Sequence, residues 1–405
     1  MQTFSELQVS AYTRERLAAN EFIVPTPVQA AATPLALAGK DVLATAQTGT
    51  GKTLAFLIPV IEQLLRDKTP GIAALVLVPT RELAMQVVDQ YNDLRGRQLP
   101  PAALVVGGLS EGKQLDSLRQ GARLVVATPG RLEDFLDRRL VNFRALRMLI
   151  LDEADRMLDM GFLPAIRRIV SILPRERQTL CFSATLETSV AHLVHDYMRQ
   201  PVRVELGSVL KASDNVRLRA FEVSTDRKLD TLCRLLAQDQ GRCLIFARTK
   251  RGAERLAINL TREGFAAAMI HGDRSQSQRT AALAGFQQGR FRVLVATDLA
   301  ARGIHVDEIS QVINYDLPEM AENFIHRVGR SGRAGAQGLA TTLYGMDQRG
   351  ELASLERTLG IKIERVQAND LPARVERKAP AHRPQSNNPS RIGRMPGEFL
   401  QAQTA

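Results

Sequence analysis

The sequence predicts an α/β protein with two tandem domains, each built on a doubly wound parallel sheet, and a disordered basic tail. Three observations predict this architecture. Short apolar runs recur along the chain, and each ends in a polar or glycine-rich turn. Segments with the apolar spacing of helices lie between these runs. The pattern pauses once, at residues 203–220, and then restarts, which indicates a break between two domains.

The apolar runs are the predicted strands. In the first half they are DVLATAQTG, ALVLVPTRE, RLVVATPGR, MLILDEADR and TLCFSATLE, and in the second half CLIFARTK, AAAMIHGD, VLVATDLAARG and QVINYDLP. The stretches SLRQ and LDTLCRLLAQ are typical of the helices between them. Because ligands bind at the carboxyl ends of the strands in such sheets, the polar residues that follow the runs are candidate functional residues.

Length and composition suggest the domain boundaries. A chain of 405 residues exceeds what one hydrophobic core usually serves. We expect an N-terminal region at 1–30, a first domain at 31–206, a linker at 207–215 and a second domain at 216–370. Residues 371–405 are rich in Pro, Asn, Ser and Arg, with six Lys+Arg against two Glu, which predicts a disordered basic tail.

Composition also bears on location and partners. No stretch approaches the roughly 18 apolar residues of a membrane span, and the N-terminus lacks the pattern of a secretory signal. Cys181, Cys233 and Cys243 lie in or beside apolar runs without metal-type spacing, so we expect buried reduced thiols in a cytoplasmic protein. The net charge of +11 fits either a solubilising surface or a polyanionic partner. Trp is absent, which argues against many stacking platforms.

A candidate phosphate-binding turn follows the first apolar run. The segment 46–53, AQTGTGKT, resembles a P-loop in which Ala46 replaces the usual first glycine. Its glycines let backbone N–H groups turn toward phosphate at the start of a helix. Lys52 would reach the β and γ phosphates of a nucleotide, and the Thr53 hydroxyl would hold Mg²⁺. A glycine-rich turn without a ligand is the weaker alternative. The predicted nucleotide-binding residues here are Ala46, Gln47, Thr48, Gly49, Thr50, Gly51, Lys52 and Thr53.

Two acids supply the second half of this site. Asp152 follows the buried run MLIL and can hold Mg²⁺ through water. The adjacent Glu153 can orient or deprotonate the attacking water. For Asp155 alone, an ordinary acidic helix N-terminus is also plausible.

Three arginines at three-residue spacing mark the second domain. Arg327, Arg330 and Arg333 lie in HRVGRSGRAG, which holds no carboxylate to pair with them. The second half has no GKT, so we expect one nucleotide site to serve both domains. Arg330 and Arg333 would then reach the γ-phosphate when the domains close, a contribution of about 10³–10⁵ in rate. The alternative is a basic surface turn, and Arg327 serves either a polyanionic partner or a structural carboxylate.

Taken in order, the motifs resemble those of a DEAD-box ATP-dependent RNA helicase, with a bacterial RhlE-like character. The resemblance covers about Phe4 to Arg365 and implies two RecA-like domains, ATP and Mg²⁺ as cofactors, and RNA as partner. The motifs are PTPVQ at 25–29, AQTGTGKT at 46–53, PTREL at 79–83, GG at 107–108, TPGR at 128–131, DEAD at 152–155, SAT at 183–185, LIFART at 244–249, HGDRSQSQR at 271–279, TDLAARG at 297–303 and HRVGRSGR at 326–333.

The resemblance also implies roles for single residues. Gln29 would read adenine through its amide, with Phe22 stacking on the ring, and Gly303 would contribute to the ATP site. RNA phosphates would be held by Pro79, Thr80, Arg81, Gly108, Thr128, Gly130 and Arg131 from the first domain and by Gln276, Arg279 and Thr297 from the second. Coupling between the domains would depend on Ser183, Thr185, Asp155 and His326. Residues 1–30 would form the Q-motif region.

Two positions depart from the family pattern. Glu21 stands where the family usually has glycine, and we expect only a local change. His305 stands where the family commonly has an aspartate that contacts the ribose of ATP, and the charge of a histidine varies near neutral pH. Asp307 has the wrong strand parity to substitute. This affects the expected ribose contact rather than the reaction class.

Other functions stay open at this stage. A DNA helicase or translocase would use the same paired domains, and an ATP-gated RNA clamp would use the same site with little unwinding. Stimulation of ATP hydrolysis by RNA but not DNA would separate the first alternative. We expect a monomer without membrane attachment that binds RNA largely without sequence preference; proteins of RNA decay or ribosome assembly are candidate partners. His192 and His195 lack a ligand set for a metal.

Overall fold

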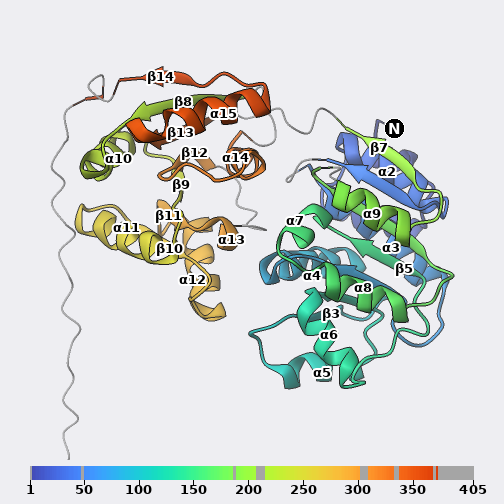
Figure 1. The fold of residues 1–405 in the computed structure, drawn as a ribbon. Coiled ribbons are helices and arrows are strands. Elements are labelled where there is room, and N and C mark those ends of the chain that lie inside the picture. The colour runs from blue at the N-terminus through green and yellow to red at the C-terminus, as the bar shows by residue number, and fades with distance from the viewer. Residues whose placement is uncertain are drawn as a thin grey trace, which may run out of the picture.

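The computed structural model describes residues 2–46, 50–185, 188–206, 215–301, 309–332, 337–367 and 371–372. Figure 1 shows two bodies, each with a twisted sheet between layers of helices. This confirms the predicted α/β class with two doubly wound parallel sheets. Residues 207–214 of the predicted linker and 373–405 of the predicted tail lie outside the described residues.

The first sheet contains seven parallel strands in the order β3-β4-β2-β5-β6-β1-β7. Every predicted apolar run of the first half forms one of them. The strands are β1 (Val42–Thr45), β2 (Ala74–Leu77), β3 (Ala103–Val105), β4 (Leu124–Ala127), β5 (Met148–Leu151), β6 (Gln178–Ser183) and β7 (Val202–Glu205).

Helices cover both faces of this sheet because successive strand residues alternate between two cores. In β5, Ile150 faces the core that contains α3, whereas Leu149 faces the core that contains α6 and α8. The helical elements are η1 (Phe4–Glu6), α1 (Ala11–Ala19), α2 (Pro27–Leu37), α3 (Lys52–Arg66), α4 (Arg81–Arg95), α5 (Glu111–Arg119), α6 (Pro129–Asp137), α7 (Ala154–Asp159), α8 (Leu163–Ile172) and α9 (Thr188–Tyr197).

The second sheet repeats the arrangement, with seven parallel strands in the order β10-β11-β9-β12-β13-β8-β14. The strands are β8 (Val216–Glu222), β9 (Arg242–Phe246), β10 (Ala267–Ile270), β11 (Val293–Ala296), β12 (Ile309–Asn314), β13 (Gly338–Tyr344) and β14 (Glu364–Val366). The helical elements are η2 (Thr225–Arg227), α10 (Lys228–Gln238), α11 (Lys250–Arg262), α12 (Gln276–Gln287), α13 (Asp298–Ala301), α14 (Ala321–Val328), η4 (Met346–Gln348) and α15 (Arg349–Leu359).

Both ends of the described chain join a core. Phe4 and Leu17 pack into the core around α3, so residues before 31 share the core of the first domain. At the other end, Leu371 is buried in the core beside α10, and its carbonyl accepts a hydrogen bond from Arg234. The core of the second domain therefore reaches one residue past the expected boundary at 370.

Helix starts follow several strands directly and are fixed by capping side chains. Thr80 accepts a hydrogen bond from the N–H of Leu83 at the start of α4, and Thr249 does the same for Gly252 in α11. Ser275 caps α12 by accepting from the N–H of Gln278. These caps hold the polar strand ends in place at the carboxyl edge of each sheet, where ligands are expected.

Candidate functional site

The phosphate-binding turn lies between β1 and α3. Gly51 has φ +87° and precedes Lys52, the first residue of α3, with Thr53 next. A side chain at Gly51 would collide with the amide of Gln29, so this position requires glycine on both counts. Lys52 is buried, and its Nζ donates to the Ala46 carbonyl at 3.0 Å. Gln47, Thr48 and Gly49 lie outside the described residues.

Gln29 connects the start of α2 to this turn. Its Oε1 accepts from the Thr26 N–H at 2.8 Å, and its Nε2 donates to the Gly51 carbonyl at 2.9 Å. One N–H and one lone pair of the amide are left for a ligand. Phe22 is partly buried and packs against the core around α3. The two residues expected at the adenine are thus attached to the same side of the first domain as the P-loop.

The acidic pair lies at the carboxyl end of β5. Asp152 is 2% exposed, and burial raises the pKa of its carboxyl to about 6, although nearby Lys52 opposes this rise. Glu153 has φ +52°, an uncommon conformation for a residue with a side chain. Its backbone N–H donates to Asp152 Oδ1 at 3.0 Å. Because burial disfavours the ionised form of this carboxyl, a cation bound beside it would stabilise the carboxylate.

Sequence reasoning missed the partner of Glu153. Arg156 is 1% exposed, and its Nη1 pairs with Glu153 Oε2 at 2.8 Å. Its Nε and Nη2 are buried without a hydrogen-bond acceptor among the described residues. The spacing of three residues in a helix was the available signal, but it is common and unspecific.

Asp155 links the acidic motif to the end of β6. Its Oδ2 accepts from the N–H groups of Ala184 at 3.0 Å and Thr185 at 3.1 Å. In return, Ser183 Oγ accepts from the Asp155 N–H at 3.3 Å. The structure therefore brings together three of the residues expected to couple the domains, and Asp155 is more than an acidic helix start.

Arg327 has a structural carboxylate as its partner. Its Nε and Nη2 each lie 2.6 Å from the Asp298 carboxylate, and Nη1 donates to Asn314 Oδ1 at 3.2 Å. It is 2% exposed. Of the two roles left open for Arg327, the structure shows the pairing with a carboxylate. These hydrogen bonds connect α14 to α13 and β12.

Arg330 and His326 face the first domain. The Arg330 Nε donates to the His326 carbonyl at 3.2 Å, and Arg330 is 2% exposed. A small pocket is lined from the first domain by Arg156 and from the second by Phe246, Asp298, Ala301, Asn323, His326, Arg327 and Arg330. The neighbourhood of Glu153 thus meets that of Arg330 across the two domains. Arg333, Gly303 and His305 lie outside the described residues.

The expected RNA residues of the first domain gather at the ends of β2, β3 and β4, three adjacent strands. Pro79 and Thr80 precede α4, and Thr128 and Gly130 begin α6. The Arg81 guanidinium lies against Gly108, whose φ is +74° and where any side chain would collide with it. Arg131 is held by Glu111, with Nη1 3.1 Å from Oε2.

Two residues of the second domain that were expected to bind RNA contact the first domain instead of being exposed to solvent. Gln276 Nε2 donates to Glu82 Oε1 at 3.0 Å, and Arg279 Nη2 pairs with the same oxygen at 2.9 Å. Burial lowers the pKa of the Arg279 guanidinium, and Arg81 adds to the effect while Glu82 opposes it. Glu82 is therefore a contact between the domains, which sequence reasoning missed.

Thr297 lies in a pocket of about 680 Å³ at the carboxyl ends of β9, β10 and β11. Its other lining residues are Arg248, Thr249, Lys250, Arg251, Gly272, Asp273 and Asp298. Lys250 Nζ pairs with Asp273 at 2.6 Å. ARTK and HGD were predicted to be polar strand ends, but no role was assigned to their residues. The pocket adds Thr249, Lys250, Gly272 and Asp273 to the candidate site.

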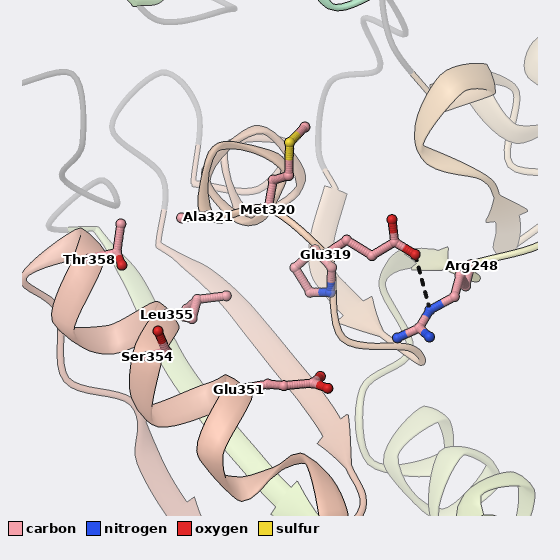
Figure 2. Close-up of a pocket in the computed structure, with 9 residues that line it drawn as sticks. Arg248, Glu319, Met320, Ala321, Glu351, Ser354, Leu355 and Thr358 are labelled. Carbon is pink, nitrogen blue, oxygen red and sulfur yellow. Dashed lines mark ion pairs between the residues drawn. The ribbon is translucent and has the colours of Figure 1, made fainter.

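A separate pocket of about 590 Å³ lies between α14 and α15 (Figure 2). Arg248 and Glu319 face each other across one side, with Nε and Oε1 4.0 Å apart, while Met320, Leu355 and Thr358 line the other. Only Arg248 is shared with the pocket around Thr297.

Other expectations concern metals, thiols and membranes. Within the described residues, no group of three His, Cys, Asp or Glu side chains has the arrangement of a metal site. Cys181, Cys233 and Cys243 are buried free thiols, as expected. No helix among the described residues is both long and apolar enough to cross a bilayer.

Two family models match the chain, one in each domain. The family model described as DEAD/DEAH box helicase matches residues 26–193, and the one described as helicase conserved C-terminal domain matches 227–335. The DEAD-box ATP-dependent RNA helicase CshA of Bacillus licheniformis is 40% identical over 92% of this chain and 77% of that protein. The ATP-dependent RNA helicase RhlB of Pseudomonas syringae is 44% identical over 84% of this chain and 88% of its own. The RhlE-like assignment is not confirmed.

Solved structures show the same two-domain fold. S. cerevisiae Dbp5 bound to RNA and ADP BeF3 matches with a TM-score of 0.82 and 29% identity, over 91% of this chain and 97% of that chain. Mss116p bound to ssRNA and AMP-PNP matches with a TM-score of 0.84 and 27% identity, over 92% and 80%. The sheets, the paired motifs and these matches together identify the chain as a member of the DEAD-box ATP-dependent RNA helicase family.

Proposed function

We propose that this helicase hydrolyses ATP at a site divided between its domains and that RNA stimulates hydrolysis by favouring contact between them. The proposal rests on two contacts between the domains, one beside the ATP residues and one beside the RNA residues. Arg156, the partner of Glu153, lines a pocket with Arg330. Glu82, next to Arg81, binds Gln276 and Arg279. ATP residues and RNA residues thus depend on the same closure.

The first domain supplies the nucleotide-binding groups. Lys52 leaves the Ala46 carbonyl for the β and γ phosphates, and the N–H groups at the start of α3 face the same anion. Gln29 and Phe22 hold the adenine. Glu153 accepts a proton from the attacking water, and Arg156 orients its carboxylate.

Thr53 and Asp152 would hold Mg²⁺. A hydroxyl and a carboxylate are oxygen ligands that suit this ion, and because burial raises the pKa of the Asp152 carboxyl, a bound cation would favour its ionised form. Phosphate and water would complete the coordination. When bound, the ion neutralises charge on the transferred phosphoryl group. Arg330 adds a second positive charge from the other domain, and Arg333 is proposed to assist it.

RNA would lie across the carboxyl edges of both sheets. Thr80, Arg81, Gly108 and Thr128 face it from the first domain, together with Pro79, Gly130 and Arg131. The second domain contributes Thr297 and the newly assigned Thr249, Lys250 and Gly272, with Gln276 and Arg279 acting through Glu82. These groups suit phosphate rather than base edges, so we propose binding largely without sequence preference. We further propose a cytoplasmic monomer; proteins of RNA decay or ribosome assembly are candidate partners.

The test compares ATPase rates with RNA and DNA of equal sequence, and strand separation with RNA duplexes. We expect stimulation by RNA only, and ATP-dependent separation of a short duplex. Lys52→Ala should abolish hydrolysis through lost phosphate binding. Glu153→Gln should retain ATP and RNA while blocking turnover. Equal stimulation by DNA would favour the DNA translocase, and stimulation without strand separation would favour the RNA clamp.

A further inference from the structure

The edge of the first sheet opposite the ATP and RNA residues is strongly basic. Because all seven strands are parallel, the loops that lead from a helix into a strand share this edge; they are residues 38–41, 67–73, 96–102, 120–123, 138–147, 173–177 and 198–201. They contain 11 Lys and Arg but only three Asp and Glu. Residues 1–206 together have a net charge of only +2, so the rest of the domain is net acidic. The basic residues are concentrated on this edge.

The loops before β5, β6, β1 and β7 are held together by hydrogen bonds. Gln178, the first residue of β6, donates its N–H to the Arg147 carbonyl at 2.8 Å and its Nε2 to the Lys40 carbonyl at 2.7 Å. The Arg199 N–H donates to Asp41 Oδ2 at 2.7 Å, and the Arg199 guanidinium donates to the Arg175 carbonyl. These strands are neighbours in the sheet, so the basic side chains form one surface.

Few acids neutralise this surface. The Asp41 carboxylate accepts the backbone N–H groups of Thr179 and Arg199. Asp67 pairs with Arg147, with Oδ2 and Nε 3.5 Å apart. Of the Lys and Arg residues in these loops that take no part in the ion pairs of the described chain, we name five the basic edge: Lys40, Arg144, Arg175, Arg177 and Arg199. All but the partly buried Arg177 are exposed.

We propose that the basic edge is a second RNA-binding surface that holds the phosphate backbone of RNA extending beyond the ATP-linked site. All five of its residues are Lys or Arg, whose positive charges neutralise RNA phosphates and release their counterions. None of the large exposed hydrophobic side chains of the described chain lies in these seven loops, and such side chains anchor protein partners. Without exposed aromatic rings to stack on bases, the surface would bind RNA independently of sequence.

This inference rests on the proposed RNA helicase function but is tested separately from it. The variant Arg144→Gln, Arg175→Gln, Arg199→Gln removes three exposed charges from the basic edge. The control variant Arg255→Gln, Arg262→Gln, Arg290→Gln removes three exposed charges from the second domain. The third variant, Arg144→Lys, Arg175→Lys, Arg199→Lys, keeps the charge of the basic edge. Binding of a 10-nucleotide and a 40-nucleotide RNA is measured for the full chain across a salt series, with the RNA-stimulated ATPase rate.

We expect the edge variant to bind the 40-nucleotide RNA roughly tenfold more weakly than the parent, with a salt dependence shallower by about 2 in log–log slope, because each lost single-strand phosphate contact removes about 0.7. Binding of the 10-nucleotide RNA and the ATPase rate at saturating RNA should match the parent. The control and Lys variants should bind the long RNA nearly as the parent does.

Three results would overturn the inference. The first is an unchanged affinity and salt slope for the long RNA. The second is an equal loss for both RNA lengths, which would indicate an effect on the ATP-linked site or on folding. The third is measured with polyglutamate as a second ligand. If the edge variant loses polyglutamate binding but keeps its RNA binding, the surface serves an acidic protein partner. If RNA fails to stimulate even the parent, the proposed function itself is at fault.

Discussion

Replacing Asp152 by Asn should stabilise the nucleotide-free first domain in a pH-dependent way. Asp152 is almost fully buried, and burial raises its pKa from 3.8 to about 6. An acid with a raised pKa holds its proton more tightly in the folded state than in the unfolded state. The stability gained from this proton is complete below about pH 4 and is lost as the pH rises through about 6. At pH 7.5 the parent protein therefore buries a charge that the Asn variant lacks.

The magnitude follows from the two pKa values. The whole shift corresponds to about 3 kcal/mol of unfolding free energy. Between pH 5, where the folded carboxyl is mostly protonated, and pH 7.5, where it is ionised, about 1 kcal/mol of this is lost. The advantage of the Asp152→Asn variant over the parent should grow by that amount between the two pH values, in buffer with a chelator and no nucleotide.

Hydrogen exchange of peptides from β5 and β6 measures the opening free energy of the first domain apart from the second. Asp137→Asn serves as the control, because it makes the same chemical change at an exposed carboxylate that pairs with exposed Arg168. If the difference between the Asp152→Asn variant and the parent is the same at pH 5 and pH 7.5, the carboxyl of Asp152 does not titrate as argued here.

Four further substitutions or truncations test the divided site. Arg330→Ala should keep the ATP affinity measured without RNA but lose on the order of 10³ in RNA-stimulated turnover; full turnover would refute the shared site. Arg156→Met should lower kcat with little change in KM, and should have no further effect in a Glu153→Gln background, whereas a purely structural role would give additive losses. Glu82→Gln should weaken the coupling of RNA binding to ATP binding by about 1–3 kcal/mol, measured as RNA affinity with and without a non-hydrolysable ATP analogue. Truncation after Pro372 keeps Leu371 in its core. It should weaken RNA binding and make that binding less dependent on salt, while ATPase activity at saturating RNA is unchanged. If the RNA affinity is unchanged at every salt concentration, the tail has no role in binding.

Nine of the fourteen described strands could be predicted from sequence because each is a local apolar run that ends in a polar turn, whereas β3, β7, β8, β13 and β14 were not predicted. An apolar run of four to six residues between polar turns is too short for most helices and is typical of a buried parallel strand. Thr80, Gly108 and Thr128 were grouped by the resemblance to the helicase family, and the structure then shows that they follow β2, β3 and β4, which end at one edge of the sheet. The P-loop was predictable from its own local pattern.

Contacts between distant segments could not be predicted in this way. Glu82 stands inside PTREL next to a predicted RNA residue, and nothing local indicates that Gln276 and Arg279 converge on it. Arg327 has the same spacing as Arg330, but only the fold places Asp298 beside it. The basic edge escaped notice because its five residues are spread over four loops that become neighbours only through the strand order.

The two hydrogen bonds of Gln29 have a consequence for nucleotide selectivity. The same amide holds the backbone at Thr26 and the carbonyl of Gly51, the residue before Lys52. A base that engages this amide must therefore act on the geometry of the phosphate-binding turn, whereas a base that does not engage it leaves the turn as it is. Discrimination against GTP should then appear mainly as slower turnover, because the triphosphate of either nucleotide can still occupy the turn and only the matching base sets Lys52 correctly.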